Sequence, residues 1–224
     1  MSDTTPPVSA DTWMSRAAAY ELCALGFLFP TRVLAEALAS GEFEESCREV
    51  MGNLELEAAP IDATCELLDS CCGVDADELF HELRKTYTGL FIGEKLPLIT
   101  PYVGLWATQQ RGEEGVLFLT RDALEIERFL RRCGVGKSLA ANQVNDPVDH
   151  VGTLCEFLKF LCLVKAQAVK ASPGATIGEE DFETFRTTYV APYAAWLAEE
   201  LPSRTDCKFY QAMGLLIDAL TRNR

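Results

Sequence analysis

The stretch NDPVDHVGTLCEFLKFLCLV, residues 145–164, predicts the helix around which the rest of the chain packs. Apolar side chains recur at helical spacing and leave almost no polar face. The main stripe consists of Val151, Leu154, Cys155, Leu158, Leu161 and Cys162, with Phe157 and Val164 beside it. Because a helix that is apolar on nearly every side has to be buried, we expect this one, over about 147–171, to be central in the fold.

The beginning of this stretch has the pattern of a helix start. Asp146 fits the N-cap, and Pro147 fits the first helical position, where its missing N–H group is not needed. Asp149 then falls at the third position, among unpaired N–H groups at the positive end of the helix dipole. Capping alone would account for both aspartates.

His150 follows Asp149 directly and is one of only two histidines in the chain. Side chains of adjacent helical residues point about 100° apart, so the pair is not expected to form a self-contained catalytic dyad. We expect His150 at the edge of the apolar face, in line with Leu154 and Phe157. No serine nucleophile motif or zinc-protease motif accompanies it, so a structural or binding role is favoured over catalysis.

The charge of the chain restricts its partners. Its 224 residues include 34 acidic and 20 basic side chains, which gives a net charge of −14. This charge repels phosphate backbones and anionic lipid, so nucleic acid and stable membrane insertion are not expected, and a basic partner fits better. Residues 1–10 have no basic segment of a secretory signal and are expected to be a disordered tail of a cytoplasmic protein.

The nine cysteines are expected to be reduced thiols, because no export signal is visible. None forms a CxxC pair, and most have the spacing of an apolar helix face, where cysteine acts as a small hydrophobe. With two histidines and no paired Cys/His spacing, we expect neither a metal site nor a cofactor.

Helical periodicity recurs along the chain, and no alternating strand pattern is found. We therefore predict an all-α fold: a single-domain helical bundle of about ten helices over residues 11–224. The expected helices cover 11–29, 31–39, 42–52, 61–72, 75–92, 121–133, 147–171, 179–190, 192–201 and 206–221. Gly93 is placed to close the 75–92 helix.

A long proline-rich loop is expected at 93–115, with the sequence GEKLPLITPYVGLWATQQRGEEG. Long irregular segments in compact domains are usually functional or disordered, and this one is too apolar to be fully solvated. It is expected either to cover the core, to bind a ligand, or to do both.

The segment CGVGKS, residues 133–138, is similar to the end of a phosphate-binding loop. The full motif requires glycine where the chain has Arg131, and it follows a strand, whereas this segment follows a helix. We read Gly134 as the residue that ends the helix, with Arg131 and Arg132 near its negative end.

Three segments together resemble the TorD/DmsD/NarJ family of redox-enzyme maturation chaperones, in particular its DmsD/TorD branch. They are YTGLFIGEKLPLITPYVGLW (87–106), NDPVDH (145–150) and YVAPYAAWLAEELPSRTDCKFYQAMGLLIDAL (189–220), with YELCALGFLFP (20–30) as a weaker match. The resemblance implies an all-α fold and a cytoplasmic, non-enzymatic chaperone. Such a chaperone binds the twin-arginine signal peptide of a molybdopterin oxidoreductase, delays its export and assists cofactor insertion. It also implies a monomer or a domain-swapped homodimer.

A twin-arginine leader has a basic segment followed by an apolar one, so its receptor needs acidic groups beside an apolar groove. By resemblance, the signal-peptide-binding residues are Tyr87, Leu90, Tyr102, Trp106, Pro147, Asp149 and His150. The first four would line the apolar part, and the last three would shape the polar end. Lys95 and Gly104 depart from the family pattern, and a cation at Lys95 would oppose an Arg–Arg motif.

Two alternatives remain open at this point. One is a NarJ-like assembly factor whose molybdoenzyme partner is not exported. The other is a GTP-binding regulatory protein or enzyme that uses Asp149, His150 and the 133–138 segment.

Overall fold

The structure is a computed structural model, and it describes residues 8–93, 96–115, 119–136 and 148–223. The elements, in chain order, are α1 (Ala10–Phe27), α2 (Arg32–Ser40), α3 (Glu42–Asn53), α4 (Ala58–Asp69), α5 (Ala76–Tyr87), the π-helical segment η1 (Thr88–Ile92), α6 (Val103–Gln110), α7 (Arg121–Arg132), α8 (Val151–Lys165), α9 (Asp181–Phe185), the π-helical segment η2 (Arg186–Val190), α10 (Ala191–Arg204) and α11 (Lys208–Arg222). Within these ranges there is no β-strand, apart from one antiparallel bridge between Tyr102 and His150. The predicted all-α bundle is confirmed.

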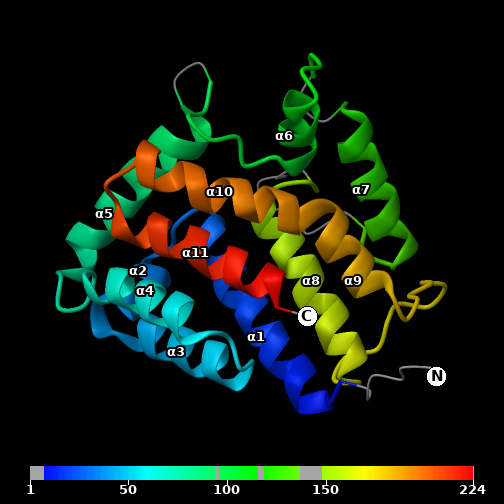
Figure 1. Ribbon diagram of the computed structural model, residues 1–224, viewed down its shortest axis with the longest axis horizontal. Helices are drawn as coiled ribbons and strands as arrows, with labels where there is room; N and C mark the ends of the chain where they lie inside the picture. Colours follow the sequence, from blue (N-terminus) through cyan, green and yellow to red (C-terminus); the bar gives the residue numbers. More distant parts are fainter. Residues whose placement is uncertain (1–7, 94–95, 116–118, 137–147, 224) are drawn as a thin grey trace.

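Helices α1 and α8 run side by side and antiparallel through the centre of the molecule (Figure 1). The stripe of α8 is fully enclosed, and Leu154, Cys155 and Leu158 have no exposed surface. The residue that follows α1 lies close to the start of α8: a Cβ atom on Gly152 would be 2.9 Å from the side chain of Leu28. The predicted central position of this helix is therefore confirmed.

The other helices cover this pair. Helix α11 packs on α10, α1 and α4, while α2, α3, α4 and α5 form the group on the left of Figure 1. Helices α6 and α7 pack on each other at the upper right, joined to the rest through α10 and the segment before α6. The buried side chains form one apolar core, into which α1, α8, α10 and α11 contribute most of their inward faces.

Local signals set most helix boundaries. The side-chain oxygens of Ser9, Thr31, Asp75 and Thr120 accept backbone N–H groups and cap α1, α2, α5 and α7. At the other end, Gly93 closes η1 with a φ of +66°. The sequence had assigned Gly93 this role, and the structure confirms it.

The predicted helices at 75–92 and 179–190 are each divided in two. Each ends in one π-helical turn, η1 or η2, instead of continuing as an α-helix. The hydroxyl of Thr88 donates to the carbonyl of Arg84, and that of Thr187 donates to the carbonyl of Glu183. Such side-chain bonds compete with the regular backbone pattern at the point where the turn widens.

Two further predictions of local structure were wrong. The expected loop at 93–115 contains α6, and α8 covers 151–165 instead of 147–171. Seven of the nine cysteines are buried, as their spacing suggested, and all nine are free. Among the described helices, none alone is long and apolar enough to cross a bilayer; α1 and α2 meet that criterion only together, across a bend of 115°.

Candidate functional site

Two segments that are distant in the sequence meet between α6 and α8. The N–H of Val103 donates to the carbonyl of Asp149, and the N–H of Val151 donates to the carbonyl of Pro101, both at 2.9 Å. These bonds flank the antiparallel bridge noted above. We call this junction the ladder; it comprises residues 101–104 and 149–152. It fixes the proline-rich segment to the start of the central helix.

The Asp149 side chain caps α6 from outside that helix. Its carboxylate accepts the N–H of Gly104 at 3.2 Å, and only 2% of the residue is exposed. Burial raises the pKa of this carboxyl group to about 6, although the hydrogen bonds from its own backbone and from Gly104 lower it. Gly104 has no room for a side chain, because a Cβ atom there would lie 2.6 Å from the backbone nitrogen of Ala123.

The His150 ring caps α8. Its Nδ1 accepts the N–H of Gly152 at 3.1 Å, so the proton of the neutral ring is on Nε2, which lies 3.1 Å from the hydroxyl of Tyr87. Burial lowers the pKa of the imidazole to about 4, so the ring is neutral near pH 7. The ring of Tyr102 packs edge-on against it at 5.7 Å.

This geometry corrects the capping prediction. His150, and not an aspartate upstream, is the N-cap of α8, and Asp149 serves a different helix. Asp146 and Pro147 lie outside the described residues. Asp149 and His150 are bonded to separate partners, as the rejection of a dyad required, but both are buried and neither lies at an exposed rim.

The other predicted peptide-contacting residues fall into two groups. Tyr87 and Leu90 are buried, at 6% and 2% exposure, and the hydroxyl of Tyr87 contacts His150 in the ladder. Tyr102 and Trp106 are half-buried, and Trp106 packs on Tyr193 at 5.5 Å between ring centres. The indole N–H of Trp106 has no hydrogen-bond partner among the described residues. The structure thus brings these residues together in one region but exposes only part of the set.

Four apolar side chains are exposed at the ends of α1 and η1 and in the segment that leads into α6, and we call them the apolar rim; its members are Phe29, Ile92, Leu96 and Leu98. Phe29 packs edge-on against Tyr87, with ring centres 5.2 Å apart. Leu98 is 57% exposed, although Ile99, the next residue, is buried and donates its N–H to the carbonyl of Leu90. Sequence reasoning noted that this loop is apolar but did not assign a binding role to Phe29 or Ile92. The available signal was position: Phe29 follows the end of α1, and Ile92 is the last residue of η1.

The described residues of the 133–138 segment form the end of a helix and give little support to a phosphate-binding loop. Gly134 has a φ of +81° and its N–H donates to the carbonyl of Arg131, which ends α7 as predicted. Arg132 is engaged by the carboxylate of Asp181 at 2.8 and 2.9 Å. Lys137 and Ser138 lie outside the described residues, as does Lys95. Over the described ranges, no cluster of three or more His, Cys, Asp or Glu side chains is arranged to hold a metal ion.

Comparison with protein families gives one match: the family described as nitrate reductase delta subunit, over residues 54–199. This range contains the ladder and most of the core around it. No curated protein and no solved structure matches the chain. The family groups NarJ- and TorD-type maturation chaperones of redox enzymes, which confirms the resemblance drawn from the motifs. The chain belongs to the nitrate reductase delta subunit family of redox-enzyme maturation chaperones.

Proposed function

We propose that this chaperone binds the twin-arginine signal peptide of a molybdopterin oxidoreductase, delays its export and assists cofactor insertion. The observation that carries the proposal is the apolar rim, whose side chains are exposed at the ends of α1 and η1 and on the segment that the ladder joins to α8. Large apolar side chains that remain exposed near one another on a protein surface are candidates for an interaction site. The apolar segment of a leader has the chemistry to cover them.

The buried residues act indirectly in this proposal. Tyr87, Leu90, Asp149 and His150 are too enclosed to contact a peptide while the ladder is intact. They position the rim by fixing the turn after η1 and the start of α6 to α8. Tyr102 and Trp106 are half-buried and would contact the peptide at the inner side of the rim. Pro147 keeps its predicted role at the polar end.

Charge supports the choice of a basic partner. The net charge of −14 attracts a segment bearing two arginines and accelerates encounter at low salt. The proposed function requires no catalysis and no resident cofactor, and its setting is the cytoplasm, where leaders are met before export. Affinity would come mainly from the apolar segment, and charge would contribute to the encounter and to the orientation of the peptide.

Isothermal titration calorimetry with the leader peptide of a reductase encoded nearby tests the proposal. We expect micromolar or tighter binding, weakened about five- to thirtyfold by Leu98→Ala, because burying one such side chain contributes about 1–2 kcal/mol. Met14→Ala is the matched control: Met14 is 44% exposed at the start of α1, away from the rim. Equal affinity of Leu98→Ala and the unsubstituted protein would exclude the rim as the contact surface.

A second candidate follows from the description of the matched family, which names a nitrate reductase subunit. On this reading the client is a molybdoenzyme subunit that is never exported and has no Arg–Arg leader. Binding of such a subunit's N-terminal peptide, undiminished when its arginines are replaced by glutamine, would favour this NarJ-like function. A loss of affinity on the same replacement would favour the twin-arginine reading.

A further inference from the structure

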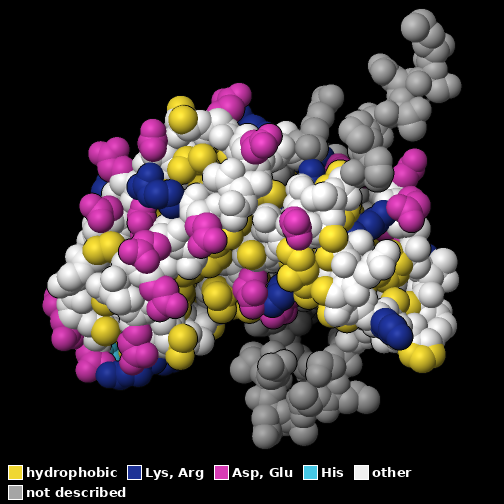
Figure 2. Space-filling view, turned by 90° about the horizontal axis from the view of Figure 1, so that it is seen from below, with side chains coloured by type: hydrophobic (Ala, Val, Ile, Leu, Met, Phe, Trp, Pro, Cys, Tyr) yellow, Lys and Arg dark blue, Asp and Glu magenta, His cyan; other side chains and the backbone are white. Residues whose placement is uncertain are grey.

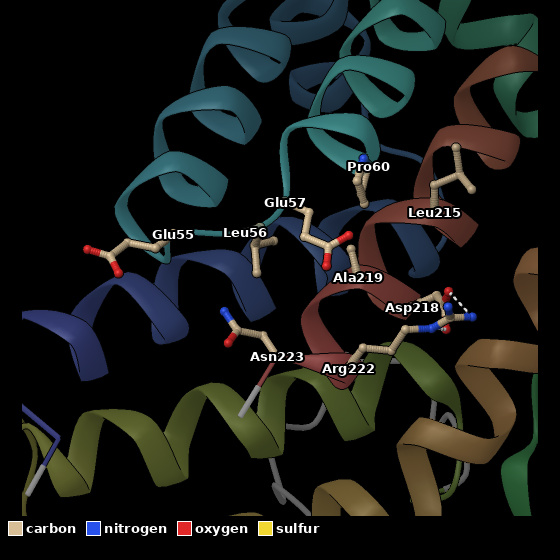
Figure 3. A pocket seen from close by; sticks show the side chains of 9 residues that line it. All are labelled: Glu55, Leu56, Glu57, Pro60, Leu215, Asp218, Ala219, Arg222 and Asn223. Atoms are coloured by element: carbon tan, nitrogen blue, oxygen red, sulfur yellow. Dashed lines mark hydrogen bonds and ion pairs between the residues drawn. The ribbon is translucent and has the colours of Figure 1, made fainter. Parts of the chain in front are cut away.

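A cleft lies between the α3–α4 corner and the C-terminal end of α11 (Figure 3). Its volume is about 460 Å³, within the range of sites that hold a small ligand or a few side chains of a peptide. In Figure 1 this part of the molecule is distant from the segment that leads into α6. The cleft shares no lining residue with the ladder or the apolar rim; its walls are formed by Glu55, Leu56, Glu57, Pro60, Leu215, Asp218, Ala219, Arg222 and Asn223.

Hydrogen bonds hold the α3–α4 corner in its conformation and join it to the end of α11. The side-chain amide of Asn223, at the end of α11, donates to the carbonyl of Leu54 at 2.9 Å. The N–H of Leu56 donates to the carbonyl of Met51, and Glu55 between them has a φ of +52°. This left-handed conformation turns the chain sharply and separates the side chains on either side of it. The corner is therefore anchored to the end of α11.

One wall is acidic and the floor is apolar. Glu57 is at the N-cap position of α4 but makes no capping hydrogen bond, and in Figure 3 its carboxylate points into the cleft above Ala219. Glu55 stands at the mouth and points outward. Among the described residues, no lysine or arginine pairs with Glu55 or Glu57. The apolar residues that line the cleft are Leu56, Pro60, Leu215 and Ala219; in Figure 3 Leu56 lies between the two glutamates, and the other three lie on the far side of Glu57.

Arg222 is the one lysine or arginine among the described residues that line the cleft, and it is already paired. The guanidinium of Arg222 bonds both carboxylate oxygens of Asp218, at 2.9 and 2.8 Å, and its side chain is 73% exposed. The carbonyl groups at the end of α11 add partial negative charge at the same place. Asp218 is thus paired, whereas Glu57 is exposed to solvent at the cleft, and its carboxylate, which lies near Ala219 in Figure 3, has no counter-ion among the described residues.

We propose that this cleft is a second docking site, which binds an arginine or lysine side chain of a partner polypeptide with an apolar residue next to it. The aliphatic part of the cation would lie on Leu56, Pro60 and Ala219, and its charged end would meet Glu57. Long cationic side chains commonly bury their stems in this way. The acidic surroundings favour such an approach: Figure 2 shows Asp and Glu side chains predominating on the side of the molecule where Figure 1 places α2, α3 and α4. The site is independent of the signal-peptide proposal.

An NMR titration of the ¹⁵N-labelled protein tests this site. The probe is the peptide acetyl-Ala-Leu-Arg-Leu-Ala-amide, and its control is the same peptide with citrulline, a neutral shape analogue, in place of arginine. We expect shifts of backbone amides in residues 55–59 and 215–223, with binding about two- to fivefold weaker for the citrulline peptide, because one exposed charge pair contributes at most about 1 kcal/mol.

Two variants with the same charge change complete the test. Glu57→Gln should reduce the affinity for the arginine peptide to that for the citrulline peptide, and Glu66→Gln, an exposed acid on α4 outside the cleft, should leave it unchanged. Equal binding of both peptides, equal effects of both variants, or shifts confined to residues 99–106 would overturn the proposal. The calorimetric result for Leu98→Ala is independent of each of these outcomes.

Discussion

The ladder and the α1–α8 interface both join distant segments inside the molecule, but they consist of different interactions. Between α1 and α8 the contact is made by many apolar side chains along two helices, and several of them have no exposed surface. At the ladder it is made by a few individual hydrogen bonds around Asp149 and His150. Both of these residues are 2% exposed.

This difference affects how each region responds to change. Apolar burial is roughly proportional to area and has no direction, so losing one contact removes a share of the stability. A buried polar group that loses its partner retains the full desolvation penalty, which makes a polar junction sensitive to single atoms and to pH. We therefore expect substitutions between α1 and α8 to change the free energy of unfolding by the same amount at every pH. Substitution of an ionisable group at the ladder should change how that free energy depends on pH.

The largest effect is expected from Leu158→Ala in α8. Leu158 has no exposed surface, so truncation leaves a cavity, and we expect a loss of about 2–5 kcal/mol in the free energy of unfolding. Urea unfolding followed by circular dichroism measures it. Leu119→Ala, at a residue that is 70% exposed, should change the value by less than about 0.5 kcal/mol. A pH-dependent loss for Leu158→Ala would contradict the distinction drawn between the two regions.

A smaller loss is expected from Gly104→Ala at the ladder. The added methyl group would lie within 2.9 Å of three atoms of Ala123, and relieving that overlap costs about 1–3 kcal/mol. Gly52→Ala is the matched control, because nothing lies within 4 Å of its Cβ position in α3; there we expect a gain of up to about 1 kcal/mol. In the same unfolding experiment, the change in the free energy of unfolding should be negative for Gly104→Ala and positive for Gly52→Ala. Changes of the same sign would show that α6 and α7 move apart to accommodate the methyl group.

The smallest effect is expected from Asp149→Asn, and its sign depends on pH. The folded-state pKa of Asp149 is raised to about 6, so above that pH a buried carboxylate opposes folding, and the amide removes this penalty while still accepting the N–H of Gly104. We expect the free energy of unfolding to rise by about 1–2 kcal/mol at pH 7.5. This is less than the free energy equivalent to the full pKa shift, because the amide accepts a weaker hydrogen bond than the carboxylate does.

As the pH falls from about 6 to 4, folded wild-type protein takes up a proton at Asp149, and the advantage of the variant should disappear. His150 acts in the opposite sense. Its pKa is lowered to about 4, so the stability that depends on its neutral ring is complete above the ordinary pKa of histidine and is lost as the pH falls toward 4. The two groups offset each other in the unsubstituted protein. Unfolding curves for wild type and Asp149→Asn at several pH values check this, and a difference that is independent of pH would contradict it.

Most of the helices could be predicted because their signals are local. The apolar periodicity of α8 and the closing glycines Gly93 and Gly134 each depend on a few neighbouring residues. The same is true of the family resemblance, which rests on short motifs. These features did not require knowledge of which segments meet in space.

The errors occur where a distant segment decides the local structure. Helix α6 follows two prolines and has no clear periodicity, but the carbonyl and carboxylate of Asp149 accept the N–H groups of Val103 and Gly104 at its start. The start of α8 was placed at Pro147, but Asp149 and His150 pair with the segment before α6, and the helix begins only at Val151, whose N–H donates to the carbonyl of Pro101. Hydrogen bonds from another segment override a capping signal that is worth only about 1 kcal/mol.

The sequence by itself determined that this protein is an acidic all-α bundle built around one apolar helix, and it identified the family through its motifs. Only the tertiary structure decided that Asp149 and His150 are buried supports, that Phe29, Ile92 and Leu98 are the exposed apolar groups beside them, and that an acidic cleft lies at the end of α11. The physical reason is that periodicity and capping are properties of neighbours along the chain, whereas exposure depends on which segments pack over a residue.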